Sequence, residues 1–495
     1  MEYIVVQAGG KGTRLEYLTK NKPKALVPVN NLPMLFHLFR KYPDKKFIII
    51  GDYKKEVLKK YLNAFAKVDF EVVDAIGTGT CGGLKAACDR IPNNKSFMLI
   101  WSDLILSNDF SVPEDDENYV GISMEFPCRW SYKDNVFFEE KSYENGVAGL
   151  FIFKDKSILK DVPDSGEFVK WLSEKKYIFK RLELHGTCEF GTLEEYNKLE
   201  VDKCRPFNKI TIENDMLIKE AIDEQGKELA TKEINWYKKV KELEFNEVPK
   251  IYSFEPLKME LIKGKNIHEC INLPLEDKKE VLLNIIKMIN NLHNLSSCEI
   301  DEKSIEDTYI TKTFDRLSKI QELVPFAKDE FIVVNGVKCK NVFFYEKELI
   351  EKLRNIKVNK FSLIHGDCTF SNMLLREDNT PVLIDPRGYF GETKLYGDPN
   401  YDWAKIYYSL VGDYDRFNLK EFKLSINEDS VDLKIESNNW KELEDMFFDN
   451  IEVNQQTIKL LHAVIWLSLT TYAWQDYDSI CAAFYNGLLY LEEVL

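Results

Sequence analysis

The sequence predicts an α/β fold, with a first domain of alternating strands and helices and a second domain that combines a small sheet with many helices. Over the first ~200 residues, short apolar runs alternate with helical patterns, which is typical of a parallel sheet covered by helices. A break near residues 201–208 precedes a hairpin pattern and then a mainly helical stretch. At roughly 100–200 residues per domain, 495 residues have room for two to four domains.

Four strands are expected in the first domain, each a compact apolar run, over 3–6, 46–51, 70–73 and 97–101. Helical patterns lie between them, over 34–42 and 54–65. Ligands of such sheets bind beyond the carboxyl ends of the strands. Two candidate loops begin there, Gly9-Gly10 and Ser102-Asp103, so both are expected at a binding site.

The stretch around Cys204-Arg205-Pro206 breaks the preceding helical pattern and predicts a boundary between domains 1–203 and 204–495. A hairpin is expected over 209–212 and 216–219, followed by a helix over about 227–240. From about residue 275 the chain reads as mainly helical, interrupted by apolar runs at 361–364 and 381–384.

Composition narrows the classes of function. Hydrophobic residues make up 44% and aromatic residues 13%, which supports folded cores. The net charge of −15 argues against a nucleic-acid partner. No apolar run approaches ~18 residues and the N-terminus reads as a strand, so neither a membrane span nor a signal peptide is expected. Ten cysteines without a CxxC pair suit a reducing cytoplasm, while the oligomeric state stays open.

A glycine-rich loop, GGKGTR over residues 9–14, directly follows the first expected strand. Glycines allow the backbone to approach phosphate oxygens, and Lys11 and Arg14 add positive charge. Lys24 follows in a proline-bounded stretch, NKPKALVPV. A tight turn and a solvated lysine are the structural alternatives to a phosphate site.

These two stretches resemble the nucleotide-sugar pyrophosphorylase family of nucleotidyltransferases, which implies a Rossmann-like nucleotidyltransferase domain. By that resemblance Arg14 and Lys24 are catalytic and stabilise charge on the α-phosphate and the leaving pyrophosphate. Lys141 contacts the acceptor phosphate, and Asp103 binds Mg²⁺. Glu189 stands where the family has a second metal-binding aspartate, and its longer arm moves the ligand. The residues expected to bind the nucleotide are Ala8, Gly9, Gly10, Gly12, Thr13, Gly79 and Gly82.

A second motif begins at His365-Gly366-Asp367. Asn372 follows five residues after Asp367, and Asp385 ends a later apolar run. Kinases use such a set as a base for the acceptor hydroxyl, an amide ligand and a carboxylate ligand for Mg²⁺. Helix caps and turns are the structural alternative.

This motif resembles the aminoglycoside phosphotransferase and choline kinase family, which implies a bilobal, protein-kinase-like α+β domain with an N-lobe over about 204–265 and a helical C-lobe over about 266–495. The resemblance makes Asp367 the catalytic base and Asn372 and Asp385 the Mg²⁺ ligands. The N-lobe has no recognisable Gly-rich loop. The resemblance also implies that Lys219 binds the ATP phosphates with Glu233 as its ion-pair partner, and that Glu260 lies in the hinge that contacts adenine. Arg387 follows the metal-binding aspartate and is expected either to bind an anionic or polyhydroxy acceptor or to pair with a nearby carboxylate.

The two halves together predict a bifunctional enzyme. One half phosphorylates a small hydroxyl compound with ATP; the other couples a phosphate monoester, expected to be a sugar 1-phosphate, to CTP, UTP or GTP. The product would be an activated precursor for a surface polysaccharide such as a capsule. Two alternatives stay open: a choline kinase joined to a phosphocholine cytidylyltransferase, and a chain in which one half is a non-catalytic nucleotide sensor.

Overall fold

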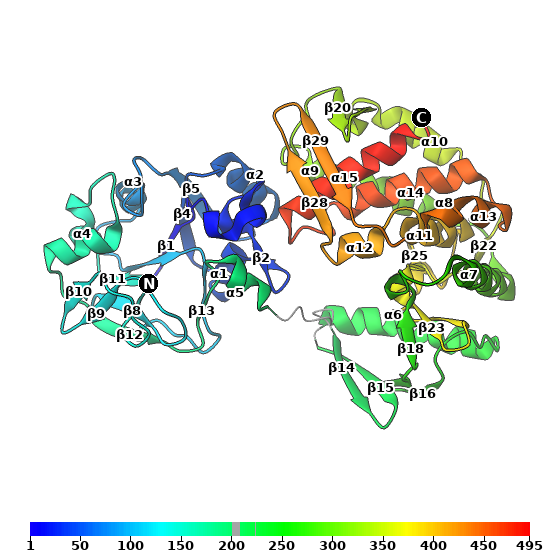
Figure 1. Ribbon diagram of the computed structural model, residues 1–495, viewed down its shortest axis with the longest axis horizontal. Coiled ribbons are helices and arrows are strands. Elements are labelled where there is room, and N and C mark those ends of the chain that lie inside the picture. The colour runs from blue at the N-terminus through cyan, green and yellow to red at the C-terminus, as the bar shows by residue number, and fades with distance from the viewer. Residues whose placement is uncertain (200–207, 223) are drawn as a thin grey trace. The chain divides into compact units, whose positions relative to one another are not determined.

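The computed structural model describes residues 1–199, 208–222 and 224–495. The chain divides into two compact units (Figure 1). The first is Met1–Val201 with Ala473–Asp478, and the second is Asp202–Tyr472 with Ser479–Leu495. The predicted boundary between residues 203 and 204 lies outside the described residues. Each unit is considered separately below.

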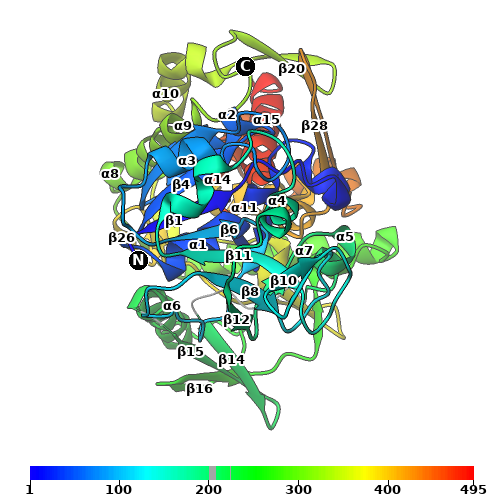
Figure 2. The same cartoon turned by 90° about the vertical axis from the view of Figure 1, so that its left-hand side faces the viewer.

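The first unit is built on one seven-stranded sheet with the order β12-β8-β11-β6-β1-β4-β5 (Figure 2). The strands β6, β1, β4 and β5 are mutually parallel, and β11 runs antiparallel to both β6 and β8. The bounds are β1 Tyr3–Gln7, β4 Lys46–Gly51, β5 Asp69–Asp74, β6 Phe97–Trp101, β8 Tyr119–Ser123, β11 Val147–Phe153 and β12 Lys180–Leu184.

The four predicted strands and their parallel arrangement are therefore confirmed, and the strand β11, which was not predicted, adds an antiparallel strand to the sheet. Every residue of β11 is buried, so the strand reads as one continuous apolar run. Such a run marks a central strand and carries no information on its direction.

Helices cover both faces of this sheet. On one face Val5, Ile48 and Leu99 share a core with residues of α3 (Leu84–Asp89) and α4 (Phe168–Lys175). On the other face the ring of Phe47 packs against Phe39 of α1, with 4.7 Å between centroids. The helices α1 (Met34–Lys41) and α2 (Lys55–Phe65) match the predicted ones.

The second unit begins with an antiparallel sheet of order β14-β15-β17-β16. The predicted hairpin is present as β14 (Asn208–Glu213) and β15 (Met216–Ala221), and the predicted helix as α6 (Glu224–Glu242). The strands β16 (Ile251–Phe254) and β17 (Leu257–Glu260) complete the sheet.

The remainder of the second unit is mainly helical, as expected. Its longer helices are α7 Leu275–Leu295, α9 Lys312–Ile320, α10 Glu346–Arg354, α11 Pro399–Leu410, α14 Gln455–Leu469 and α15 Tyr477–Glu492. Short strands β22 (Phe361–Leu363) and β24 (Pro381–Leu383) occupy the two predicted interruptions. No helix in the described part of the chain is long and apolar enough to span a membrane.

One sheet in this part was not predicted. It has the order β21-β20-β29-β28, with β20 Phe331–Val334, β21 Val337–Lys340, β28 Phe422–Ile426 and β29 Ser430–Ile435. The turn Asn335-Gly336, with φ of 50° and 77°, is a hairpin signal that the helical reading overlooked. The parallel pairing of β20 with β29 joins distant segments and has no local signal.

Candidate active sites

The loop after β1 needs glycine at two positions for structural reasons. A Cβ at Gly9 would lie 2.8 Å from the Cβ of Asp52. Gly12 has a φ of 63°, in the left-handed region, and a Cβ there would crowd the side chains of Thr19 and Lys24. Glycine at position 12 therefore brings the loop close to Lys24.

Gly10 differs from these neighbours, because a Cβ added to it would meet no atom within 4 Å. Ala8 is buried and its N–H donates to the carbonyl of Ile50 at 3.0 Å, which fixes the start of the loop to the sheet. Thr13 begins a short 3₁₀ helix, η1 (Thr13–Thr19). The backbone at Gly10 is thus open to close approach, which suits a phosphate group.

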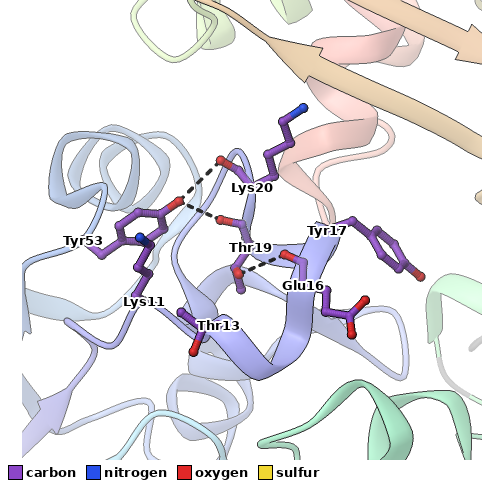
Figure 3. A pocket seen from close by; sticks show the side chains of 7 residues that line it. All are labelled: Lys11, Thr13, Glu16, Tyr17, Thr19, Lys20 and Tyr53. Carbon is purple, nitrogen blue, oxygen red and sulfur yellow. Dashed lines mark hydrogen bonds between the residues drawn. The ribbon is translucent and has the colours of Figure 1, made fainter.

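A pocket lies beside this loop (Figure 3). The Nζ of Lys11 lies 5.8 Å from the centre of the Tyr53 ring, whose hydroxyl donates to the carbonyl of Thr19 at 3.0 Å. The lining residues are Lys11, Thr13, Glu16, Tyr17, Thr19, Lys20 and Tyr53. Lys11 and Thr13 belong to the loop predicted to bind the triphosphate, so an anion bound in this pocket would lie close to the positive charge of Lys11.

Lys24 and Asp103 form an ion pair. Lys24 begins the short 3₁₀ helix η2 (Lys24–Leu26) directly after Pro23, and Asp103 lies just beyond the carboxyl end of β6. Their side chains are only 11% and 16% exposed. The fold therefore holds the predicted catalytic lysine against the predicted metal ligand in a poorly solvated place.

Glu189 and Arg14 join this pair. Glu189 ends the strand β13 (Cys188–Glu189), and the N–H of the next residue, Phe190, donates to the carbonyl of Asp103 at 3.0 Å. A Cβ at Gly191 would lie 2.7 Å from Glu189 Oε1 and 3.3 Å from an Arg14 guanidinium nitrogen. Burial and the neighbouring charge of Asp103 raise the pKa of Glu189 to about 7. The structure thus brings together Arg14, Lys24, Asp103 and Glu189.

The carboxylates of Asp103 and Glu189 offer a hard, all-oxygen donor set. Two carboxylates supplemented by substrate phosphates fit Mg²⁺, which rarely uses a cage made only of protein ligands. Burial and then the charge of Asp103 raise the pKa of Glu189, and a cation bound between the two carboxylates would oppose this rise. Among the described residues no group of three or more His, Cys, Asp or Glu side chains gathers in metal-binding geometry.

Gly79 and Gly82 lie in a turn next to the end of β1. Gly79 has a φ of 75°, and its carbonyl accepts from the N–H of Gly82 at 3.1 Å. The Nε2 of Gln7 donates to the carbonyl of Thr80 at 2.7 Å, which ties the turn to β1. A Cβ at Gly79 would lie 2.5 Å from the carbonyl of Gly166, so packing alone requires glycine there.

Lys141 is exposed, and no described contact joins it to Lys24 or Asp103. Its Nζ lies 5.8 Å from the centre of the Tyr143 ring. The next residue, Ser142, pairs through its backbone with Cys128. Burial and the negative charges of Glu189 and Asp103 raise the pKa of the Cys128 thiol to about 12. Lys141 therefore lies on a segment that borders the carboxylate pair, and its contact with an acceptor stays a prediction.

In the second unit, Lys219 connects the small sheet with the helical part. Its Nζ lies 2.8 Å from a carboxylate oxygen of Glu233 on α6 and 2.8 Å from Asp385, which follows β24. The predicted pairing of Lys219 with Glu233 is thus present. Asp385 has a φ of 53°, a conformation that is costly for a residue other than glycine and that collects at functional sites.

Asp367 lies at the centre of the second predicted site. Its Oδ2 accepts a hydrogen bond from Asn372 Nδ2 at 2.9 Å, and its Oδ1 lies 2.9 Å from Lys405 Nζ. Asn372 ends the 3₁₀ helix η7 (Phe370–Asn372), and Lys405 lies on α11. Asn372 and Asp385 again supply oxygen donors, as an Mg²⁺ ion bound to phosphates requires.

The loop that carries Asp367 is held by Asp402, which lies on α11. The fully buried carboxylate of Asp402 accepts from the N–H of His365 at 2.9 Å and of Gly366 at 2.8 Å. It also bonds His293 Nε2 at 3.1 Å. Gly366 has a φ of 81°, which turns the chain sharply before Asp367.

The side chains of Glu260 and Arg387 are both engaged with other side chains of the protein. Glu260 forms a two-pronged ion pair with Arg376, at 2.8 and 3.0 Å. Arg387 donates to the hydroxyl of Tyr401 at 3.0 Å and lies 4.3 Å from the centre of the Tyr389 ring. It makes no ion pair with a carboxylate among the described residues. Contact of Glu260 with a nucleotide stays a prediction.

Sequence reasoning missed Lys405. A signal was available, because Lys405 is the one charged residue in the otherwise uncharged stretch 403–410 of α11. A lysine inside a buried helix face needs a charged partner. The partner it has is the predicted base, Asp367.

Comparison with known proteins concerns the first unit. Residues 3–113 match the family model described as nucleotidyl transferase. The bifunctional protein GlmU of Methanococcus maripaludis is 26% identical over 149 residues, which are 30% of this chain and 34% of that protein. UTP–glucose-1-phosphate uridylyltransferase AglF of Haloferax volcanii is 46% identical over 57 residues, 11% of this chain and 24% of that protein. The chain thus spans about a third or less of the length of these two relatives.

Among solved structures, HddC from Yersinia pseudotuberculosis is 25% identical, with 40% of this chain and 98% of that chain covered and a TM-score of 0.33. The N-terminal part of the chain is related to the nucleotidyl transferases. The matched family model lies within the first unit, so the kinase hypothesis for the second unit rests on its own residues.

Proposed function

We propose that the first unit transfers a nucleotidyl group from CTP, UTP or GTP to a small phosphate monoester, with a sugar 1-phosphate as the preferred acceptor. The observation that carries this proposal is the convergence of Arg14, Lys24, Asp103 and Glu189 beyond the carboxyl ends of the strands. Three parts of the sequence that lie far apart supply these charges, namely residues 14–24, Asp103 and Glu189. A purely structural ion pair would not need two cations and two carboxylates together in a poorly solvated place.

The reaction is a displacement at phosphorus. An oxygen of the acceptor phosphate bonds to the α-phosphorus, the bond from that phosphorus to the bridging oxygen breaks, and pyrophosphate leaves. Both reactants are anions, so the protein must supply positive charge and alignment. Arg14 and Lys24 supply charge beside the loop that binds the triphosphate. A bound Mg²⁺, held by Asp103 and Glu189, would further neutralise the phosphates.

We propose that the second unit phosphorylates a hydroxyl compound with ATP. The acceptor oxygen bonds to the γ-phosphorus, the bond to the β,γ-bridging oxygen breaks, ADP leaves, and the hydroxyl proton passes to Asp367. The pairing of Lys219 with both Glu233 and Asp385 supports this role, because kinases use a lysine paired with a glutamate beside a metal-binding aspartate. Asn372 and Asp385 would hold the Mg²⁺ that neutralises charge on the phosphates.

The combined product would be a nucleotide-activated building block for a surface polysaccharide such as a capsule. The kinase site would make a phosphate monoester, and the first site would consume one. Release of pyrophosphate from CTP, UTP and GTP, each with glucose 1-phosphate, mannose 1-phosphate and phosphocholine, tests the first half. Turnover with a sugar 1-phosphate is expected; turnover with phosphocholine alone would overturn the sugar preference.

A further inference from the structure

Four cationic side chains gather around the predicted base Asp367. Lys405 is paired with it directly, and Arg387 packs behind it, because a Cβ on Gly366 would lie 3.0 Å from the Cβ of Arg387. The other two, Lys312 and Arg316, lie one helical turn apart on α9 and so share one face of that helix.

Aromatic rings connect two of these cations, Arg387 and Lys405, with the turn that precedes α9. The ring of Tyr401 has Arg387 and Lys405 at 6.0 Å each. Tyr309 packs against Tyr401 with 6.2 Å between centroids. Tyr309 lies in a short π-helical turn, Glu306–Thr311, which ends where Lys312 begins α9. Lys312 follows Tyr309 by three residues, and such π-helical turns are frequent at functional sites.

Among the residues that the structure describes, one of these four cations, Lys405, is paired with a carboxylate. Lys405 uses the carboxylate of Asp367. Arg387 bonds the hydroxyl of Tyr401, and Arg316 bonds the carbonyl of Ser468. Lys312 has no hydrogen bond and no ion pair within the described ranges. Burial, and then the neighbouring charges of Arg387, Arg316 and Lys405, hold the pKa of Lys312 well below its ordinary value.

Half-buried like charges repel one another and lose solvation, so an arrangement of this kind stabilises a bound anion rather than the empty fold. We propose that the acceptor of the kinase site is a small hydroxy compound that also carries a carboxylate or a phosphate, which Lys312, Arg316 and Arg387 bind beside Asp367. This inference rests on the proposed kinase function and names the chemical class of its substrate.

The same cluster disfavours a quaternary ammonium acceptor. A cation such as choline is held by aromatic faces and carboxylates. Here the rings of Tyr389, Tyr401, Tyr408 and Tyr414 already face Arg387 or Lys405. A positively charged acceptor bound here would be repelled by both Arg387 and Lys405.

A binding experiment tests the anion site without knowledge of the natural acceptor. Inorganic phosphate is titrated by calorimetry into the full chain and into Lys312→Met, Arg387→Ala and Lys59→Ala variants; Lys59 is exposed on α2 and serves as the control. Binding that is weakened at least tenfold by Lys312→Met and Arg387→Ala, and retained in Lys59→Ala, supports the proposal. Equal binding by all four proteins would overturn it. Lys312→Met keeps the apolar stem and removes a repelled charge, so its melting temperature without phosphate is expected to equal or exceed that of the wild type.

A turnover experiment separates this inference from the kinase function. ADP release from ATP is measured with glycerol, glycerate, glycerol 3-phosphate, glucose, glucuronate, glucose 6-phosphate and choline. We expect kcat/KM to be at least tenfold higher with an anionic member than with its neutral counterpart, and the carboxylate and phosphate members show which anion is used. ADP release that is fastest with a neutral compound or choline would leave the kinase standing and overturn the inference. Phosphate binding at the cluster with no Asp367-dependent ADP release from any compound would overturn the kinase function instead.

Discussion

Lys24 and Asp103, which lie 79 positions apart in the chain, form an ion pair beyond the carboxyl ends of the central strands. The pairing joins the lysine expected at the transferred phosphate to the carboxylate expected at the metal. In the proposed reaction, Lys24 would exchange Asp103 for a phosphate of the triphosphate, and Asp103 would exchange Lys24 for Mg²⁺. The ion pair therefore holds the lysine and the carboxylate in position, at a small cost in free energy, before the substrate binds.

The two glycines Gly9 and Gly10 are expected to differ in their tolerance of alanine. Gly9→Ala would press a Cβ against Asp52 and is expected to destabilise the first unit by about 1–3 kcal/mol. Gly10→Ala meets open space, so the fold should keep its stability while KM for the nucleoside triphosphate rises about tenfold or more. Thermal unfolding and pyrophosphate-release kinetics measure the two effects. An unchanged KM for the nucleoside triphosphate in Gly10→Ala would contradict the proposal that this loop binds the nucleotide.

The two predicted metal sites are expected to respond to different substitutions. EDTA should abolish both pyrophosphate release and ADP release, and Mg²⁺ should restore both. Glu189→Gln removes one ligand charge from the first site and should raise the Mg²⁺ concentration needed for pyrophosphate release. Asn372→Ala should do the same for ADP release. Each reaction is titrated with Mg²⁺ in each variant.

The control for the metal titration is Glu194→Gln. Glu194 is exposed and close in sequence to Glu189. The Glu194→Gln substitution should leave the Mg²⁺ concentrations needed for pyrophosphate release and for ADP release unchanged. A shift of both requirements by Glu189→Gln or by Asn372→Ala would contradict two separate metal sites.

Asp402 is expected to be critical for the stability of the second unit. Its buried carboxylate accepts from the backbone of His365 and Gly366, so Asp402→Ala leaves these donors and His293 without their partner. Loss of one member of a buried charged network costs about 3–5 kcal/mol. Urea unfolding measures this loss, and Asp445→Ala on the exposed side of α13 (Glu444–Asp449) is the control that should unfold like the wild type. If Asp402→Ala lowers the free energy of unfolding by less than 1 kcal/mol, the conformation of the loop does not depend on Asp402.

His462 is expected to make the second unit more sensitive to acid. Burial lowers the pKa of His462 from 6.5 to about 3, and its Nε2 accepts a hydrogen bond from Trp466 at 3.0 Å. The unfolded chain therefore binds a proton at position 462 below pH 6.5 that the folded chain does not bind, so the contribution of His462 to stability falls as pH falls through this window. One pH unit is worth about 1.4 kcal/mol, which gives about 2 kcal/mol between pH 6.5 and 5.

The variant His462→Asn isolates this effect, because the other titrating groups stay the same in both proteins. Asp398 and Asp413, whose pKa values are raised to about 6, act in the opposite direction and cancel in the comparison. Urea unfolding at pH 6.5 and 5 should show the wild type losing about 2 kcal/mol more than the variant. The same acid response in both proteins would contradict a neutral, buried His462.

Local patterns were sufficient to predict the elements that carry both sites. The strand ends at Gly9 and Asp103 and the hairpin that carries Lys219 follow from apolar runs and turn residues within a few positions. The pairing of Lys219 with Glu233 came from a resemblance in sequence, and the structure contains it.

Long-range relationships were out of reach. The direction of β11, the pairing of β20 with β29 and the assignment of Ala473–Asp478 to the first unit join segments that carry no matching local signal. Lys312 looked like an ordinary helical lysine, because the sequence does not show which charges surround it. Its surroundings follow from the packing of α9 near Tyr401.

Two single substitutions in two assays test the two-site account most directly. Lys24→Met should lower pyrophosphate release by at least a hundredfold and leave ATP-dependent ADP release at the wild-type rate. Asp367→Asn should lower ADP release by at least a hundredfold and leave pyrophosphate release, measured with supplied sugar 1-phosphate, unchanged. Lys59→Ala, on the exposed side of α2, should change neither rate. Loss of both activities in either Lys24→Met or Asp367→Asn, with the fold intact, would contradict the account.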